Sequence, residues 1–469
     1  MLIGCTESRI SDDTSLRLSF EKDTVCFDTV FTGVGSATKQ VMIYNRNKSA
    51  LCIEKICQDG TNDYFHINVD GENQLSNIHK LTINGGDSMY IFIRVSINPF
   101  KQNAPVLVED NIHFVVNGKD QKMHLEAIGQ DVQLIKSKKG ITFYNSKQFN
   151  AAKPYLIYDT IAVQGLLTFD AGARLYFHDK AVLYAYGSVS SNGDLVHPVT
   201  MQGDRIDRLF DSVPYSYVAG MWGGVFLIMP PDAATAPTYQ FNYTEIRSAN
   251  VGLYCSSERT TDLPQLRLTN SLIHNHAVYG LVLQNVDAKV ANSEISNAAA
   301  YCVYLAGGKQ RFIHNTIASY FNNTNVRIQS VPREDAAAVY INNLSKNNAE
   351  TQASFVNCIV DGVRNNNFVV ATPLPEYYPF EITGNYLKAD SLQVLGAKDN
   401  IYRKIDDTTS VFVNNYYKYK EYKYYDFRLD SLSPARGIGD SLSALAYPID
   451  RLGHSRINQR PDAGCYQYR

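Results

Sequence analysis

A short apolar pattern that returns between residues 241 and 360 limits most strongly what this chain can fold into. The first members of successive units lie 27, 22, 22 and 43 positions apart, and 43 is close to twice the shortest step. Repetition at a period of about 20–50 residues indicates stacked units, each of which buries its apolar face against its neighbours. In every unit an apolar residue is followed five positions later by another: Phe241/Ile246, Leu268/Ile273, Val290/Ile295, Phe312/Ile317 and Phe355/Val360.

A second apolar segment follows in four of the units, at Val251–Cys255, Tyr279–Leu283, Tyr301–Leu305 and Ala338–Ile341. These segments are short, alternate with a period of two, and lack the 3.6-residue stripe of helical repeats, so each unit is predicted to be a coil of two or three strands. The corners carry Asn, Ser and Gly. An asparagine repeated from coil to coil can hydrogen-bond to the next turn and tolerates a left-handed corner; three share one register, Asn270, Asn292 and Asn357.

These units resemble those of the right-handed parallel β-helix, the pectate-lyase-like superfold. Residues 140–430 are predicted to form one continuous stack. The segment Gly165–Gly172 resembles the opening coils of secreted β-helix proteins, and Trp222–Phe226 matches the next landmark of that pattern. Trp222 is predicted to be a core residue. One inward column is predicted to contain Ile246, Ile273, Ile295, Ile317 and Val360.

Composition excludes some classes of function. A chain of 469 residues is too long for one ordinary core, which favours two domains or an elongated repeat, and its 32 Tyr and 21 Phe favour strands. The formal net charge of −2 argues against nucleic acid as a partner. None of the eight cysteines forms a zinc-type CxxC pair, and we expect neither a metal nor a cofactor. Cys52 and Cys57 could form a disulfide or remain free.

The first residues, Leu2-Ile-Gly-Cys5, resemble a bacterial lipobox, although the apolar and basic regions that normally precede one are nearly absent from this sequence. The resemblance implies that Cys5 is the lipidated residue. Residues 1–15 are therefore expected to be a lipobox remnant and a polar tether. No segment approaches the roughly 20 apolar residues of a spanning helix, so we expect a lipid-anchored protein of the cell envelope, at the outer membrane of a Gram-negative bacterium.

Residues 16–131 are expected to form a β-sandwich of seven or eight strands. Alternation from Tyr90 to Ile97 predicts a strand with one buried face, and Asn117-Gly118 is a strong hairpin signal. The segment resembles the Ig-like domains of the abnormal-spindle/hydin type, which act as spacers or docking modules. The matching residues are Val41–Asn45, Leu51–Ile53, Phe65–Ile67, Gly86–Ser88, Asn98-Pro99, Ile112–Phe114 and Leu125–Gly129.

Residues 431–469 contain Ser433-Pro-Ala435 and Asp462-Ala-Gly-Cys-Tyr466. Together with Asp426–Leu429, these motifs resemble the terminal segment of envelope β-helix proteins. We expect this segment to be a cap on the open end of the stack, because an exposed strand edge would otherwise template aggregation.

An active site is not evident from the sequence. Glu245, Asp287 and Glu294 look scattered, and the Asn-Thr-Asp and Gly-His-Gly strings of polygalacturonase-type enzymes do not occur. Two interruptions, residues 204–219 and 322–337, could instead form the site of a polysaccharide lyase or glycoside hydrolase, because loops on a rigid scaffold often carry function. A metal near Asp204/Asp207 or Glu334/Asp335 would favour an enzyme. Alternatively, the two interruptions are solvated loops with local ion pairs.

The leading functional expectation is non-catalytic recognition or scaffolding of a polysaccharide or a surface protein. With Leu253, Leu281, Val303 and Val339 inside, the next residues of the second strands point outward. These residues are Tyr254, Val282, Tyr304 and Tyr340, so three of four adjacent coils carry an outward tyrosine. Sugar rings stack on such aromatic faces, although tyrosines also simply suit a strand surface. A structural spacer without a ligand is the third possibility. The predicted ligand-binding residues are Tyr254, Tyr304, Tyr340, His276, Arg327 and Arg333.

Overall fold

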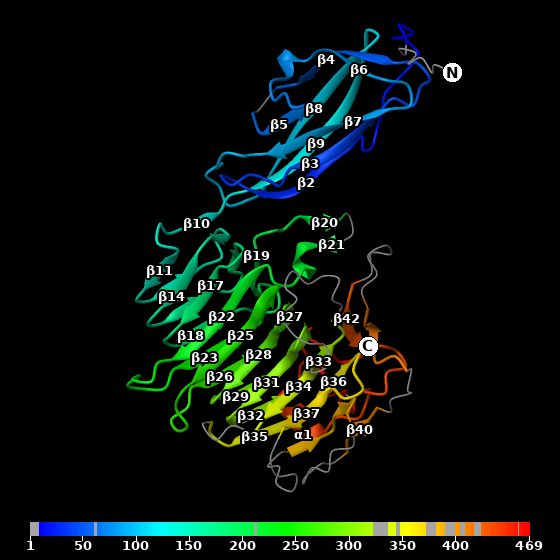
Figure 1. Cartoon of the computed structure of the whole chain (residues 1–469). Helices are drawn as coiled ribbons and strands as arrows, with labels where there is room; N and C mark the ends of the chain where they lie inside the picture. The colour runs from blue at the N-terminus through cyan, green and yellow to red at the C-terminus, as the bar shows by residue number, and fades with distance from the viewer. Residues whose placement is uncertain are drawn as a thin grey trace, which may run out of the picture. The chain divides into compact units, whose positions relative to one another are not determined.

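The computed structural model describes residues 9–60, 63–210, 213–321, 336–343, 348–371, 381–389, 399–403, 409–416, 424–457 and 459–469. The chain forms two compact units, Met1–Val132 and Gln133–Arg469 (Figure 1). The division after Val132 lies between the expected sandwich, residues 16–131, and the expected β-helix, residues 140–430. The predicted fold class, a β-sandwich followed by a parallel β-helix, is confirmed.

The first unit is a sandwich of two sheets. One sheet has the order β1 (Ser19–Phe20), β3 (Lys39–Tyr44), β7 (Ser88–Val95), β5 (Phe65–Val69), and every pair in it is antiparallel. The other has the order β2 (Thr24–Phe31), β9 (Lys119–Gln130), β8 (Val106–Val116), β4 (Leu51–Gln58), β6 (His79–Ile83), with only β2 and β9 parallel. A short 3₁₀ turn, η1 (Leu75–Asn77), precedes β6.

Alternation explains the core of this sandwich. Ile91, Ile93 and Val95 of β7 are fully buried, whereas the residues between them are exposed. The β8–β9 hairpin turns at Asn117-Gly118, where both residues have positive φ, 50° and 66°, as the predicted tight turn requires. Cys52 and Cys57 are free thiols, so the structure contains no disulfide between them.

The second unit is built from three parallel sheets, in which each strand pairs with the corresponding strand of the next coil. Sheet 1 has eleven strands: β10 (Gln133–Ile135), β13 (Tyr155–Ile157), β16 (Arg174–Phe177), β19 (Val199–Gly203), β24 (Thr244–Arg247), β27 (Leu272–His276), β30 (Glu294–Ala298), β33 (Thr316–Ser319), β36 (Ile359–Gly362), β39 (Tyr386–Leu387) and β40 (Ile401–Tyr402).

Sheets 2 and 3 have nine strands each. Sheet 2 comprises β11 (Ile141–Tyr144), β14 (Thr160–Val163), β17 (Val182–Ala185), β22 (Trp222–Met229), β25 (Ala249–Ser257), β28 (Tyr279–Gln284), β31 (Tyr301–Ala306), β34 (Ala337–Asn342) and β37 (Phe368–Ala371). Sheet 3 comprises β12 (Lys147–Phe149), β15 (Leu167–Phe169), β18 (Val189–Asn192), β23 (Thr238–Asn242), β26 (Gln265–Thr269), β29 (Asp287–Ala291), β32 (Gly308–Ile313), β35 (Thr351–Val356) and β38 (Glu381–Thr383).

The predicted inward columns are present. In sheet 1, Ile246, Ile273, Ile295, Ile317 and Val360 pair in that order and are at most 1% exposed. Sheet 3 supplies the matching column, which contains Phe241, Leu268, Val290, Phe312 and Phe355. The stack begins at β10, earlier in the chain than residue 140, because residues 133–135 already pair with β13.

Trp222 is a core residue, as predicted. Its ring is fully buried and stacks on Phe177 with 4.1 Å between ring centroids. The indole Nε1 donates a hydrogen bond of 2.8 Å to the Arg247 carbonyl. The large ring therefore fills the coil interior, and its single polar atom has a partner.

The asparagine corners adopt the expected conformation. Asn270, Asn292 and Asn357 have φ values of 53°, 51° and 55°. The Asn292 amide donates to Asn270 Oδ1 at 3.2 Å, and the Asn270 amide donates to Asn242 Oδ1 at 2.8 Å. These side chains link neighbouring coils at a position where most residues would be strained.

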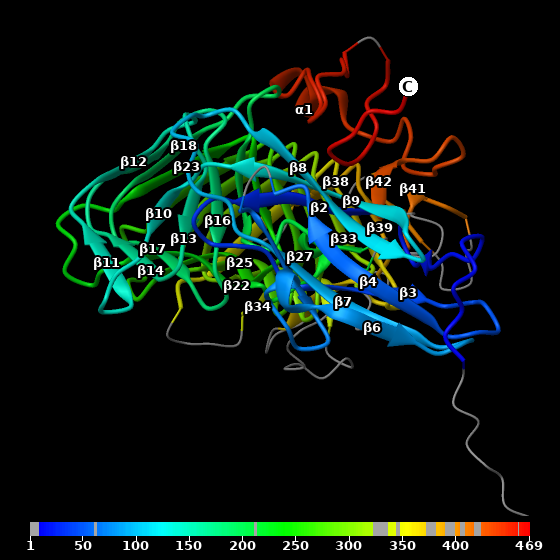
Figure 2. The same cartoon turned by 90° about the horizontal axis from the view of Figure 1, so that it is seen from above.

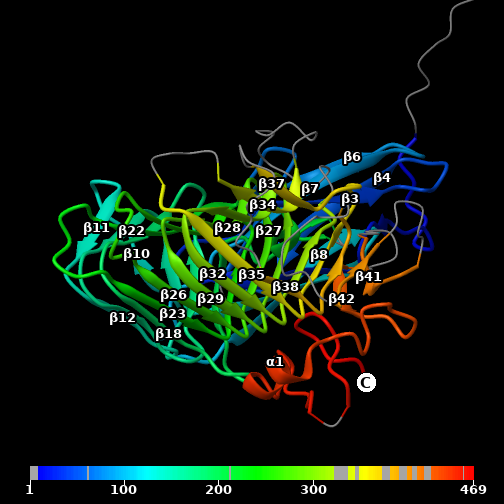
Figure 3. The same cartoon turned by 90° about the horizontal axis from the view of Figure 1, so that it is seen from below.

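The C-terminal segment covers the β-helix along one side. It contains the antiparallel pair β41 (Phe412–Asn414) and β42 (Asp426–Leu429), and the helix α1 (Ser441–Ala446). Figures 2 and 3 show it beside the coils, and its apolar residues pack on Ala318, Ile359 and Tyr386 of sheet 1. This segment, which we also call the C-terminal cover, thus lies on a flank of the stack, whereas we expected it over the open end. Within the described residues no helix is both long and apolar enough to cross a membrane.

Candidate functional site

The most extended candidate surface is the outward face of sheet 2. Tyr254 pairs with Val282, Val282 with Tyr304, and Tyr304 with Tyr340, so the four residues form one column across β25, β28, β31 and β34. Their neighbours Leu253, Leu281, Val303 and Val339 are fully buried in the coil interior. The predicted alternation of inward and outward residues is therefore correct, and the three tyrosines share one face.

Two further tyrosines, which sequence reasoning did not include, widen this column. Tyr279 and Tyr301 pair in register and stack with a centroid distance of 5.9 Å and an interplanar angle of 14°. Tyr301 also stacks on Tyr340 at 4.6 Å, and Tyr304 stacks on Tyr340 at 5.8 Å. We call Tyr254, Tyr279, Tyr301, Tyr304 and Tyr340 the tyrosine face. Tyr279 and Tyr301 lie three residues before Val282 and Tyr304. Strict alternation would therefore place them on the inward face, so the sequence pattern gave no signal for them.

The tyrosine face continues toward the N-terminal coils. Phe226 of β22 lies 5.4 Å from Tyr254 and 5.3 Å from Tyr184 of β17, measured between ring centroids. All the rings of this surface are half-buried, whereas Val282 beneath them is only 3% exposed. The surface is therefore a continuous aromatic floor whose ring faces and edges remain partly accessible.

Polar groups border the tyrosine face and orient two of its hydroxyls. Tyr254 Oη donates to Gln284 Oε1 at 3.2 Å, and the Asn342 amide donates to Tyr304 Oη at 2.8 Å. Burial raises the pKa of the Tyr279 phenol, so this ring is neutral at physiological pH. Rings bordered by amide groups offer both stacking surfaces and hydrogen-bond partners.

The other predicted ligand-binding residues do not join this surface. His276 is fully buried at the end of β27, and burial lowers its pKa to about 3, so the imidazole is neutral and sequestered. Arg327 and Arg333 lie outside the described residues, as do Glu334, Asp335 and Cys5.

The interruption 204–219 forms local pairs. Asp204 accepts from His178 at 2.7 Å, and Arg205 forms an ion pair with Asp207 at 2.6 Å while lying over the ring of Tyr215. Both carboxylates are thus already engaged. The short strands β20 (Arg208–Phe210) and β21 (Val213–Pro214) lead into the turn η2 (Tyr215–Tyr217), whose Tyr217 contacts the second candidate site.

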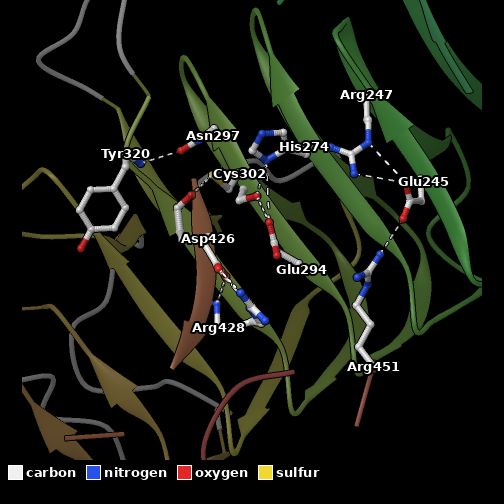
Figure 4. Close-up of polar contacts among 12 residues, drawn as sticks. Glu245, Arg247, His274, Glu294, Asn297, Cys302, Tyr320, Asp426, Arg428 and Arg451 are labelled. Atoms are coloured by element: carbon white, nitrogen blue, oxygen red, sulfur yellow. Dashed lines mark hydrogen bonds and ion pairs between the residues drawn. The ribbon is translucent and has the colours of Figure 1, made fainter. Parts of the chain in front are cut away.

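This second site is a polar pocket of about 310 Å³ between sheet 1 and the C-terminal segment, which we call the flank pocket. Figure 4 shows Glu245, Arg247, His274 and Glu294 on the strands, facing Arg451 of the C-terminal segment. Glu245, Leu272 and Glu294 form one outward column, and Arg247, His274 and Ser296 form the next. The pocket residues are Tyr217, Arg247, Leu272, His274, Glu294, Tyr425, Asp426, Phe427, Arg428, Arg451, Leu452 and Tyr466.

One hydrogen-bonded network joins the two walls of the flank pocket. Glu245 accepts from Arg247 at 3.2 Å and from Arg451 at 3.0 Å. Arg451 donates to Tyr466 Oη at 3.5 Å, and Tyr466 Oη donates to Glu294 at 2.5 Å. The network links two glutamates of the coils to two residues of the C-terminal cover and so attaches this cover to the stack.

The network also determines the proton position on His274. Ser296 Oγ donates its one proton to Glu294 Oε1 at 2.6 Å, so the 2.8 Å contact to His274 Nδ1 requires Nδ1–H as the donor. Burial, followed by the nearby Arg247, lowers the pKa of His274 far below its usual range. The neutral ring therefore carries a lone pair on Nε2, which has no hydrogen-bond partner within the described part of the chain.

The carboxylates Glu245 and Glu294 thus belong to one site, although they looked scattered in the sequence. The sequence did not reveal this pocket because Arg451 and Tyr466 lie far from these strands in the chain. An imidazole with so low a pKa is a weak base, and both glutamates are held by fixed donors. The geometry consequently resembles a structural polar network more than an acid–base pair.

One group of described residues has the ligand types for a cation. Glu109, His124 and Glu126 on β8 and β9 place one ligand atom each within 4.8 Å of one another. His124 Nε2 lies 3.4 Å from Glu109. The group is partly exposed, and no step of the proposed function requires a metal there.

Comparisons with known proteins add little to this geometry. No protein-family model matches the chain, and no curated protein matches it. One partial likeness among solved structures is the Vibrio cholerae VesB protease, at 11% identity over 24% of this chain and 31% of that chain, with a TM-score of 0.18. A second is the E. coli chaperone DraB, at 9% identity over 26% of this chain and 56% of that chain, with a TM-score of 0.17. A third is the ASH/PapD-like domain of human CEP192, at 7% identity over 29% of this chain and 99% of that chain, with a TM-score of 0.18. Likenesses at such TM-scores carry no argument about fold or function.

Proposed function

We propose that this protein is a non-catalytic, glycan-binding protein whose β-helix recognises a polysaccharide through the tyrosine face. The observation that supports this most is the in-register array of stacked, half-buried tyrosines on β25, β28, β31 and β34. Coils lie about 4.8 Å apart, so a glycan chain along the stack meets aromatic rings repeatedly. The rings supply stacking, and Gln284 and Asn342 supply polar contacts at their edges.

The test compares polysaccharide binding by the wild type and by a Tyr304→Ala, Tyr340→Ala double variant. A panel of neutral and acidic polysaccharides is screened by affinity electrophoresis, and positive ligands are titrated by calorimetry. Loss of two stacking rings is expected to weaken binding by about tenfold or more. The matched control is Tyr90→Ala in the sandwich, whose side chain is 46% exposed. Unchanged affinity of the double variant, with its thermal unfolding preserved, would refute the assignment.

We further propose that the protein is anchored in the cell envelope by lipid on Cys5. The lipobox-like Leu2–Cys5 motif and the polar segment after it support this location. The sandwich then acts as an Ig-like spacer on the N-terminal side of the β-helix, as its resemblance to Ig-like domains implies. We propose that the lipid anchor lies in the outer membrane of a Gram-negative bacterium.

A polysaccharide lyase or glycoside hydrolase is the second candidate function. The flank pocket favours it because the pocket gathers carboxylates, arginines, a histidine and three tyrosines in about 310 Å³. The low pKa of His274 and the fixed donors of Glu294 oppose it. New unsaturated or reducing ends released from any polysaccharide in the panel, and lost in a Glu294→Gln variant, would establish the enzyme and displace the binding assignment.

A further inference from the structure

The outward face of sheet 3 carries a column of positive charge that none of the functions above uses. Arg267, Lys289 and Arg311 pair directly with one another across β26, β29 and β32, and all three are exposed. Figure 3 shows these strands side by side. Lys309, also exposed, lies two residues before Arg311 on β32 and therefore on the same face. We call these four residues the basic column.

The positive charges of the basic column are not paired with carboxylates of the described residues. None of its four members forms an ion pair with a carboxylate of the described residues. Asp287 is the one acid beside it on these three strands, and its carboxylate accepts from the Lys309 backbone amide at 2.9 Å. Four cations and one carboxylate leave a local charge of +3, in a chain whose net charge is −2. Like charges placed directly opposite on neighbouring strands destabilise a sheet.

Hollows flank the basic column on both sides. A cavity of about 410 Å³ contains Arg267, Lys289 and Lys309 together with Gln240 and Gln265. A second cavity, of about 530 Å³, also reaches Gln240 and Arg267 and extends to the asparagine corners and the C-terminal segment. The two cavities share Gln240 and Arg267 and so adjoin at these residues, and each spans several successive coils. We call the two adjoining cavities the groove.

Amides and a tyrosine form the far wall of the larger cavity. Asn242 and Asn270 line it, and Asn292, only 4% exposed, leaves its Oδ1 without a hydrogen-bond partner within the described residues. Tyr447 lies across the groove, with Lys289 Nζ 5.4 Å from its ring centroid. The carboxylate of Asp450, which also lines the cavity, is buried and accepts three backbone N–H groups, so its oxygens are already engaged by the chain.

We propose that this groove binds a linear anionic glycan. Its carboxylates or sulfates face Arg267 and Lys289 in the groove and Arg311 on the next coil, and its hydroxyls face the amide wall. The cations recur once per coil, about every 4.8 Å along the stack, which suits a polymer that carries charge at regular intervals. Amide groups pair with hydroxyls in both directions, as donors and acceptors. Glu381, two coils beyond Arg311 in the same column, marks where the positive surface ends.

This proposal is independent of the tyrosine face, because the two surfaces lie on different sheets. A glycan is favoured over a nucleic acid by the hydrogen-bonding groups of the groove, because the net charge of −2 acts equally on both kinds of polyanion. An acidic glycan chain is narrow and carries hydroxyls that the amide wall can bond.

The test uses the full chain and a triple variant, Arg267→Gln, Lys289→Gln, Arg311→Gln. Binding to polygalacturonate, dextran sulfate and neutral dextran is measured by calorimetry at several salt concentrations. We expect the wild type to bind at least one anionic polymer and not neutral dextran, with an affinity that falls as salt rises. The triple variant is expected to bind about tenfold or more weakly. Polygalacturonate and dextran sulfate distinguish carboxylate from sulfate recognition.

Matched controls separate this site from the tyrosine face and from net charge. Lys55→Gln, Lys119→Gln, Lys122→Gln removes the same charge from exposed positions of the sandwich and should leave the affinity unchanged. The Tyr304→Ala, Tyr340→Ala variant should also retain anionic-polymer binding, so this inference and the proposed function can fail separately. Three results would overturn the proposal. The wild type binds neither anionic polymer, the lysine control loses as much affinity as the triple variant, or single-stranded DNA of similar charge binds more tightly than the polymers.

Discussion

Replacing Ile295 tests the register on which every surface described above depends. Its side chain is fully buried between Ile273 and Ile317 of the neighbouring coils. Ile295→Ala removes buried methyl groups and leaves a cavity that a rigid stack can only partly close, which costs about 2–5 kcal/mol. Ile295→Asp should cost more, because it places an unpaired charge in the interior. Gln240→Ala, at an exposed position of β23, is the matched control.

Hydrogen exchange measured by mass spectrometry locates this loss of stability. In a stacked repeat each coil depends on its neighbours, so the effect of Ile295→Ala should concentrate in β27, β30 and β33. A loss of about 2 kcal/mol corresponds to about 30-fold faster exchange through local opening. Exchange that is unchanged in these three strands, or that rises equally in Gln240→Ala, would refute the inward column.

The remaining predictions concern pH, the C-terminal cover and the anchor. Burial lowers the pKa values of His274, His276 and His314, so below about pH 6.5 the unfolded chain binds more protons than the folded one. The free energy of unfolding should therefore fall as the pH drops from 7 to 5, by up to about 1.4 kcal/mol per pH unit for each histidine; urea midpoints that do not change with pH would contradict this. Tyr466→Phe removes the donor 2.5 Å from the buried Glu294 and should destabilise the cover by about 1–3 kcal/mol, seen as faster limited proteolysis within 431–469. Expression behind a complete lipoprotein signal sequence should give a membrane-bound protein that Cys5→Ser releases, whereas equal fractionation of both forms would exclude the anchor.

The repeat made most of the β-helix predictable. Apolar residues of period two, spaced by nearly constant steps, determine which side chains face inward, and the columns of Ile295 and Val303 followed directly. The asparagine corners were predictable for a related reason, since Asn is one of few residues that adopt positive φ at low cost. The outward position of Tyr254, Tyr304 and Tyr340 then required only the same alternation.

Features that depend on contacts distant in sequence were not predictable. The flank pocket joins Glu245 to Arg451 and Glu294 to Tyr466, and no periodicity relates these residues. The side of the stack that the C-terminal segment covers depends on such pairs, so its flank position could not be read from its motifs. The basic column was visible in principle, because Arg267, Lys289 and Arg311 recur at steps of 22 residues, but periodic charges are informative only once the outward register is known.

Hydroxyl-radical footprinting of a polysaccharide complex tests the central claim most directly. A polysaccharide identified in the binding screen is added at saturation, and tyrosine oxidation is quantified by mass spectrometry with and without it. If the β-helix recognises glycans through the tyrosine face, oxidation of Tyr254, Tyr304 and Tyr340 should fall on binding, while oxidation of the exposed Tyr90 stays constant. Protection confined to other surfaces, with these three tyrosines oxidised equally in both states, would contradict the account.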